Sequence, residues 1–196
     1  MKDPVEDIHQ FWFGPLDEAG FAAARQHALW FSASEETDTA IATRFGAVVQ
    51  QALDDDLGDW ADSDTGLIAL VVVLDQFTRN MYRGTPGAFA GDAAALQLAR
   101  QAIRSNRHRS LPVIHRVFLY MPLEHSENLA TQQECVRLFS ALAEETGAAS
   151  VTDFTRYAAA HRDVIARFGR FPHRNTLLGR TSSPEELAYM DTHRGF

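Results

Sequence analysis

The sequence predicts an all-α protein, a single-domain array of roughly eight to ten helices. Apolar residues recur at three- and four-residue spacing over most of the chain. Helix-capping residues precede many of these runs. Only one apolar run is rich enough in β-branched residues to form a strand, and a lone buried strand would leave its backbone groups unpaired. We therefore expect helices throughout.

Size and composition are those of a soluble globular protein. The chain has 196 residues, 45% of them hydrophobic and 22% charged, and we expect one domain over residues 1–196. Its single cysteine, Cys135, cannot form an internal disulfide, which favours a reducing compartment such as the cytoplasm. The N-terminus lacks the pattern of a secretory signal. No membrane partner is expected, because the longest apolar stretch, Leu67–Leu74, is much shorter than the ~20 residues that a spanning helix needs.

The first helices are predicted from their capping residues. An Asp-Pro-x-Glu start at residues 3–6 supplies an N-cap, a proline in the first turn and a capping-box acid, and Gly14 ends this helix. Ser34 is expected to cap a helix over residues 35–53. The segment Leu67–Phe77 is the β-branched run, and we interpret it as a helix that passes through the middle of the fold because it is apolar on all sides.

Later helices follow the same rules. Pro122 should end or kink the helix in which it lies. The remaining helices are expected to start at Asp92, at Ser110 with Pro112, at Ser126, at Thr152, and at Ser183 with Pro184 and Glu186.

Charged residues lie where a core is expected, in three sets. The first set is Asp75, Arg79 and Arg83, which continue the buried stripe of the central helix. Asp75 and Arg79 have the spacing of a helical ion pair. The second set is Glu124, His125 and Glu127, at the junction that Pro122 marks. Helix capping accounts for the presence of Ser126 and in part for that of Glu127, but it does not account for Glu124 and His125.

The third set is the segment His161–Arg180, whose five arginines and two histidines face one acid, Asp163. Its formal charge is +4, whereas the whole chain carries -8. Such a field marks a place for anions, either a ligand or the carboxylates of the protein itself. His161 lies on the apolar stripe of the last long helix, so we expect a buried ring with a hydrogen-bond partner or a role in a site. Arg167 is expected to be structural, and Arg170, Arg174 and Arg180 are candidates for a ligand.

Three motifs resemble a known family. They are DQFTRNMYRGTP at Asp75–Pro86, FLYMPLEHSENLATQ at Phe118–Gln132 and HRDVIARFGRFPHRNTLLGR at His161–Arg180. Together with FWFG at Phe11–Gly14, they resemble the bacterial DUF924 family, a domain of unknown function. The resemblance implies a helical fold with tetratricopeptide-like superhelical stacking, and it implies no activity. Thr78 stands where the family pattern has proline, which makes a continuous helix through Arg79 easier to form.

The leading hypothesis is that the three sets converge on a pocket for an anionic small molecule or a carboxylate-bearing peptide. An arginine fork matches phosphate or carboxylate at two points. The residues expected to bind the ligand are Asp75, Arg79, Arg83, Glu124, His125, His161, Arg162, Arg170, His173, Arg174 and Arg180.

The second hypothesis is a hydrolase or a phosphoryl-transfer enzyme. The candidate catalytic residues are Glu124, His125, His161 and Asp163, which could act as acid and base beside His173. Neither a metal nor another cofactor is expected, because the metal-binding HExxH and paired-cysteine motifs are missing. We interpret Cys135 as a packed residue rather than a nucleophile.

The third hypothesis is an interaction scaffold that holds a segment of a partner protein. Aromatic residues could line such a groove, although core packing is the better explanation for most of them; they are Phe11, Trp12, Phe13, Trp30 and Phe31. Nucleic acid is not an expected partner of so acidic a chain. Its only other basic cluster reads as a solvated helix end, formed by Arg104, Arg107, His108 and Arg109.

Overall fold

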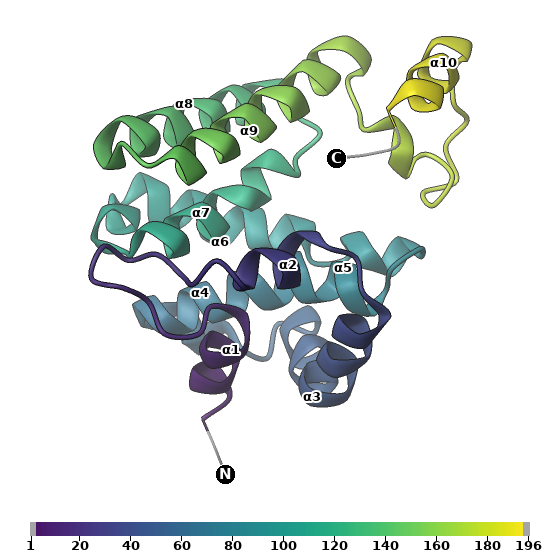
Figure 1. Cartoon of the computed structure of the whole chain (residues 1–196). Helices are drawn as coiled ribbons and strands as arrows, with labels where there is room; N and C mark the ends of the chain where they lie inside the picture. The colour runs from purple at the N-terminus through teal and green to yellow at the C-terminus, as the bar shows by residue number, and fades with distance from the viewer. Residues whose placement is uncertain (1–2, 194–196) are drawn as a thin grey trace. The chain divides into compact units, whose positions relative to one another are not determined.

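The computed structural model describes residues 3–193, and these residues form ten α-helices joined by turns and 3-10 helices (Figure 1). Within that range the only extended pairing is an isolated bridge between Leu16 and Ala22. The all-α prediction is therefore confirmed. None of the described helices is long and apolar enough to cross a membrane.

The chain divides into two compact units. The first unit contains Met1–Arg83 and Gly87–Pro122, and the second contains Gly84–Pro86 and Leu123–Phe196. The single-domain organisation and the tetratricopeptide-like stacking stay predictions.

The first unit begins with helices whose caps were predicted from the sequence. The Asp3 carboxylate accepts a hydrogen bond from the Val5 amide, and Ser34 caps α3. Helix α2 was not predicted, because its few residues are too short for a helical period to show. The helices of this unit are α1 (Pro4–Trp12), α2 (Gln26–Phe31), α3 (Glu35–Leu53), α4 (Asp64–Val72), α5 (Thr78–Met81), α6 (Asp92–Arg104) and most of α7 (Val113–Glu124).

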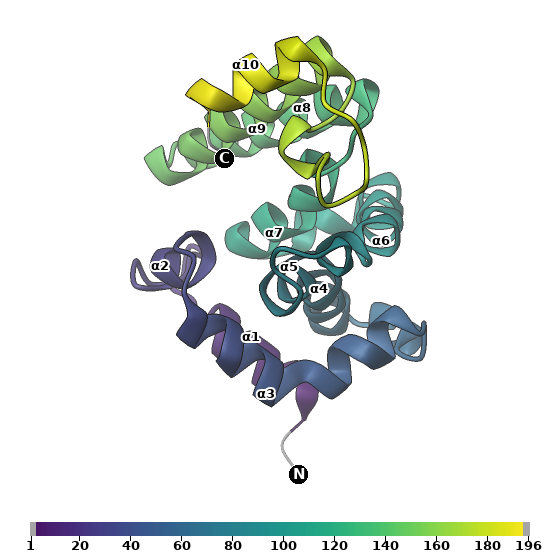
Figure 2. The same cartoon turned by 90° about the vertical axis from the view of Figure 1, so that its right-hand side faces the viewer.

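The β-branched run forms the predicted central helix. Helix α4 continues through a π turn at Val73–Phe77 into α5, so the helix is continuous through Arg79 as the threonine at position 78 predicts. Every residue from 66 to 78 is buried. The Thr78 hydroxyl donates to the Leu74 carbonyl at 2.8 Å. Helix α3 packs against α5 and the π turn (Figure 2).

Aromatic side chains fill the interior of the first unit. The Trp12 ring meets the rings of Phe77 and Phe118 at 5.4 and 5.8 Å, and Phe13 meets Phe118 at 5.3 Å. Trp12, Phe13 and Trp30 are buried and Phe11 is half-buried, so core packing explains these candidate groove residues. The exception is Phe31, whose side chain is 54% exposed.

The second unit is built on a pair of long helices, α8 (Leu129–Thr146) and α9 (Ala149–Phe168), which lie side by side (Figure 1). Gly147 ends α8 with a φ of 62°, a left-handed conformation that suits glycine. A short helix, α10 (Pro184–Thr192), follows, and its capping box at Ser183 and Glu186 confirms the predicted start.

Two predicted helix starts in the second unit were wrong. Ser126 does not cap α8; its amide donates to the Leu123 carbonyl in a turn, and the Asn128 side chain caps the helix by accepting from the Thr131 amide. Helix α9 begins at Ala149 rather than Thr152, with no side-chain cap at its start.

Pro122 lies inside α7 and does not end it.

Candidate functional site

The first charged set lies in the first unit, where Asp75 is fully buried in the π turn. The predicted Asp75–Arg79 ion pair is present, with Arg79 Nη2 3.5 Å from Asp75 Oδ1. The same Nη2 makes a shorter contact of 2.8 Å with Asp92, and Gln76 Nε2 donates to Asp75 at 2.6 Å. The Arg79 guanidinium also lies over the Phe89 ring, at 5.5 Å from its centroid. These groups form a compact polar network around the central helix.

Arg83 does not continue the buried stripe, which corrects the sequence-based expectation. Helix α5 ends at Met81, so Arg83 lies beyond the helix, with its side chain 48% exposed. Its guanidinium donates to Asp38 on α3 at 2.6 Å. This hydrogen bond lowers the pKa of the Asp38 carboxyl, so the pair joins α3 to the end of the central helix.

The arginines of the third set are largely engaged by carboxylates of the second unit. Asp163 binds its neighbour Arg162, not Arg167 four residues on, because Arg167 reaches α10 instead. The ion pairs are Arg162–Asp163 at 2.6 Å, Arg167–Glu185 at 2.9 Å, Arg170–Glu186 at 2.6 Å and Arg180–Glu127 at 2.6 Å. The positive charges of this segment are therefore paired mostly with acidic residues that lie outside residues 161–180.

Glu127 joins the second set to the third. Its carboxylate accepts from Arg180 at 2.6 and 2.9 Å and from the Phe171 amide at 2.8 Å. Burial raises the pKa of this carboxyl, but the hydrogen bonds from Arg180 and Phe171 outweigh burial and lower it. Glu127 thus holds the loop after α9 at two points.

Glu186 holds the same loop from α10. It is 3% exposed and accepts from Arg170 Nε at 2.6 Å, from the Ser183 amide at 2.7 Å and from Asn175 Nδ2 at 3.3 Å. The Arg170 hydrogen bond is the main reason that the pKa of Glu186 falls to about 2. One predicted capping acid therefore also serves as the counter-ion of a predicted ligand-binding arginine.

His161 is buried with a hydrogen bond, as its place on the apolar stripe predicts. Its side chain is 9% exposed, and Nδ1 lies 2.9 Å from the Tyr157 carbonyl and 3.3 Å from Glu124 Oε1. Nδ1 therefore carries a proton in the neutral ring. Burial lowers the pKa of His161 to about 3, so the ring is neutral at physiological pH.

Other residues of the second and third sets gather around His161. The Phe171 ring meets His161 at 5.6 Å and His173 at 5.6 Å, and the Arg174 guanidinium lies over Phe171 at 4.5 Å from its centroid. The His125 ring lies 6.4 Å from His161. We call Glu124, His125, His161, Phe171, His173 and Arg174 the His161 cluster. Its Arg174 is 6% exposed and its Glu124 is 7% exposed.

Sequence reasoning missed residues that position this cluster. Gln132 is fully buried, and its Nε2 donates to the carbonyls of Glu124 and Ser126, which fixes the turn that carries Glu124 and His125. Asn175 Oδ1 accepts from Arg180 Nε at 2.9 Å. Gln132 lies in the motif Phe118–Gln132 and Asn175 in the motif His161–Arg180, but a motif alone does not distinguish a positioning residue from a packed one.

The structure thus brings the second and third sets together in the second unit. The first set belongs to the first unit, so convergence of all three stays a prediction. Cys135 is fully buried, and burial raises its thiol pKa, as suits a packed residue. Within residues 3–193, no three His, Cys, Asp or Glu side chains are grouped so that they could hold a metal ion.

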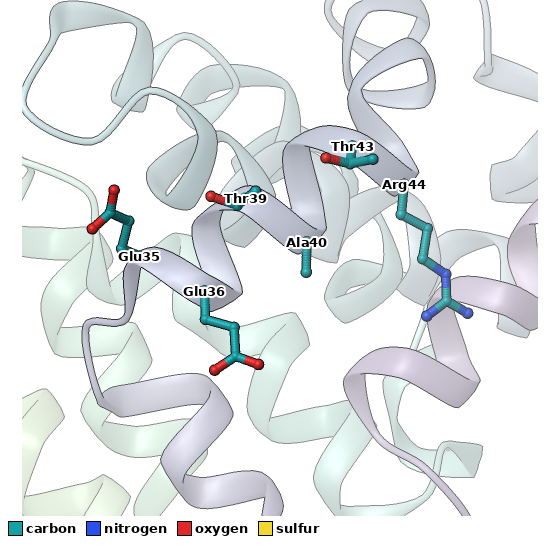
Figure 3. Close-up of a pocket in the computed structure, with 6 residues that line it drawn as sticks. All are labelled: Glu35, Glu36, Thr39, Ala40, Thr43 and Arg44. Atoms are coloured by element: carbon teal, nitrogen blue, oxygen red, sulfur yellow. The ribbon is translucent and has the colours of Figure 1, made fainter.

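A surface hollow lies elsewhere, along one helix of the first unit. Figure 3 shows its lining residues, which all come from α3: Glu35, Glu36, Thr39, Ala40, Thr43 and Arg44. Most of these side chains are exposed, and Arg44 is paired with Asp7 at 2.6 Å. None of them is a predicted site residue, and the hollow lacks a buried polar group that would orient a ligand.

Comparison with known proteins decides the family. Residues 8–194 match the family described as "Bacterial protein of unknown function (DUF924)". The chain belongs to the DUF924 family. A solved structure of a protein of unknown function from Agrobacterium tumefaciens, ATU0120, is 33% identical and has a TM-score of 0.80. The alignment covers 96% of this DUF924 protein and 97% of that chain. No curated protein matches.

Proposed function

We propose that this DUF924 protein binds a small anionic molecule, or the carboxylate end of a peptide, at the His161 cluster. The observation that supports this proposal is the joint burial of Glu124, His161 and Arg174, each less than 8% exposed when the whole residue is counted. Removing charges from water costs several kcal/mol per ion unless partners compensate. A guanidinium, a carboxylate and an imidazole placed together at that cost are the groups that recognise polar ligands.

Arg174 is the proposed anion contact. Its guanidinium is always charged and presents a planar fork that matches carboxylate or phosphate at two points. The contact of this guanidinium with the face of Phe171, at 4.5 Å from the ring centroid, is a cation–π interaction that orients the fork. The neutral His161 ring adds a polar group without a second positive charge. Glu124 favours a ligand that also carries a hydroxyl or amine, because a carboxylate accepts hydrogen bonds.

The other arginines of this segment are proposed to build the site rather than to contact the ligand. Arg170 and Arg180 each make two hydrogen bonds to one carboxylate, on Glu186 and Glu127. These bonds hold the loop that carries His173 and Arg174. Arg162 and Arg167 form more exposed ion pairs, which contribute about 0–1 kcal/mol each.

A thermal-shift panel tests the proposal. Inorganic phosphate, acetate and citrate should raise the melting temperature of the wild type, and Arg174→Gln should abolish the rise. Arg167→Gln is the matched control and should keep it, because Arg167 is more than half exposed and faces Glu185. If none of the anions shifts the wild type, or if both variants respond like the wild type, the proposal is wrong.

The Glu124–His161 contact supports a second candidate, a hydrolase or phosphoryl-transfer enzyme. A carboxylate beside Nδ1 orients an imidazole for acid–base work. A histidine whose pKa is about 3 is, however, a weak base at neutral pH, which favours binding over catalysis. Turnover of p-nitrophenyl phosphate or p-nitrophenyl acetate that His161→Gln abolishes would favour the enzyme.

The α8–α9 pair supports a third candidate, an interaction scaffold. A pair of adjacent long helices is the unit that tetratricopeptide-like proteins repeat, and such stacking is part of this proposal. Recovery of one stoichiometric partner in a pull-down, insensitive to Arg174→Gln, would favour the scaffold over ligand binding.

A further inference from the structure

A histidine pair in the first unit is distinct from the His161 cluster. His9 lies on α1 and His115 lies on α7, and their ring centroids are 4.9 Å apart. The Phe13 ring meets both, at 5.5 Å from His9 and 4.7 Å from His115. The contact therefore joins the N-terminal helix to a helix that follows it by about a hundred residues in the sequence.

The surroundings favour uncharged rings. His9 Nε2 lies 2.8 Å from the Thr65 carbonyl, so this nitrogen carries the proton. His115 is 7% exposed, and its Nε2 is buried without a hydrogen-bond partner among the described residues. Burial, and then the charge of His9, lower the pKa of His115 to about 3. Burial also lowers the pKa of His9.

The charged groups on the neighbouring helices do not supply a counter-ion. Asp7 is bound to Arg44 at 2.6 Å, and Asp64 is bound to Arg107 at 2.6 Å. Within the first unit, the titratable and charged groups of α1, α2, α4 and α7 besides the pair itself are Glu6, Asp7, His27, Asp64, Arg116 and Tyr120. Among residues 3–193, the side-chain charge that shifts the pKa of His115 is that of His9, and both rings would be positive when protonated.

We propose that the His9–His115 contact is an acid-sensitive latch. It holds α1 against the rest of the first unit at neutral pH and releases α1 as the imidazoles become protonated. Protonation of either ring places a charge where burial shields it from water, and protonation of both adds repulsion between two cations. Opening of α1 returns both rings to water. The proton balance is simple, because each imidazole takes one proton from solvent as the contact opens.

The size of the effect follows from the difference between the closed and open states. With a pKa of about 3 in the closed state and roughly 6.5 in the open state, His115 alone raises the opening equilibrium about 25-fold between pH 7 and pH 5. His9 acts in the same direction, because its pKa is also lowered.

Hydrogen exchange measured by mass spectrometry on the full chain tests the latch. After correction for the intrinsic pH dependence of exchange, amides of α1 should open at least about 25-fold more often at pH 5 than at pH 7. His115→Phe keeps an aromatic ring beside Phe13 and removes the proton site, so this increase should shrink by about 25-fold. A uniform rise in exchange across the first unit would instead show global unfolding and would contradict a local latch.

His9→Gln provides a second variant if His115→Phe does not fold, because glutamine can still donate to the Thr65 carbonyl. It should also reduce the pH response of α1. An NMR titration of the wild type adds a direct readout, in which the His115 ring should not titrate between pH 7 and pH 5 in the closed state. The latch is wrong if α1 exchange is independent of pH, or if the folded variants keep the wild-type response.

Discussion

Replacing Glu127 with glutamine should destabilise the second unit more than any exposed charge change there. The Glu127 side chain is 25% exposed and its carboxylate accepts three hydrogen bonds, two from Arg180 and one from the Phe171 amide. Glutamine keeps one oxygen acceptor and places an amide N–H group toward a guanidinium donor. The change therefore removes at least one charge-assisted hydrogen bond and places a guanidinium N–H of Arg180 opposite an amide N–H instead of an acceptor.

The expected loss is about 2 kcal/mol of unfolding free energy, because hydrogen bonds to charged groups contribute roughly 1.5–3 kcal/mol each. Glu185→Gln is the matched control. Its carboxylate also binds an arginine, Arg167, but the two side chains are 66% and 51% exposed. Exposed pairs contribute about 0–1 kcal/mol, so the control should lose less than half as much.

Urea and thermal unfolding followed by far-UV circular dichroism measure the difference. The helical signal is the right probe for the second unit, because the three tryptophans, Trp12, Trp30 and Trp60, all lie in the first. At about 2–4 °C per kcal/mol for a chain of this size, Glu127→Gln should lower the melting temperature by roughly 4–8 °C. Equal losses for Glu127→Gln and Glu185→Gln would refute the assigned role of Glu127.

Two further predictions concern packing and pH. Gly91→Ala should destabilise by about 3 kcal/mol in urea unfolding, because its Cβ would lie 2.1 Å from the Leu74 carbonyl oxygen in the π turn. Gly46→Ala lies inside α3, where the added Cβ would make an ordinary van der Waals contact of 3.6 Å with the Met81 methyl group, so it should gain about 0.5–1 kcal/mol. The reverse order of the two variants would contradict the packing. The buried His161, with a pKa of about 3 when folded, binds fewer protons than in the unfolded chain, so unfolding free energy should fall by about 2 kcal/mol between pH 7 and pH 5 on its account. His161→Gln should flatten that slope, and an unchanged slope would show that the ring is not held neutral.

Local chemistry explains which parts of the fold were predictable. The starts of α1, α3 and α10 follow from residues 3–6, Ser34 and Ser183, because an N-cap bond reaches only two or three residues along the chain. The start of α8 was missed because Ser126 and Asn128 are both good caps. The choice between them depends on Gln132, which ties the Ser126 carbonyl into a turn.

The candidate site was predictable only in part, for a related reason. Helical spacing places His161 on a buried stripe, and the structure confirms its burial. Spacing cannot pair charges that are distant in sequence, and Arg180 binds Glu127 from 53 residues away. The excess of arginine in this segment therefore suggested a ligand-binding site, although most of these arginines form ion pairs with carboxylates of the protein, such as Glu186.

The role of Arg174 is the central claim, and NMR observation of arginine side chains tests it directly. On titration with citrate or inorganic phosphate, the Nε–Hε signal of Arg174 should shift saturably, while that of Arg167, bound to Glu185, should not follow. Signals of Arg174 and the exposed arginines that move together without saturation, or an Arg174 signal that does not move, would contradict the proposed anion site.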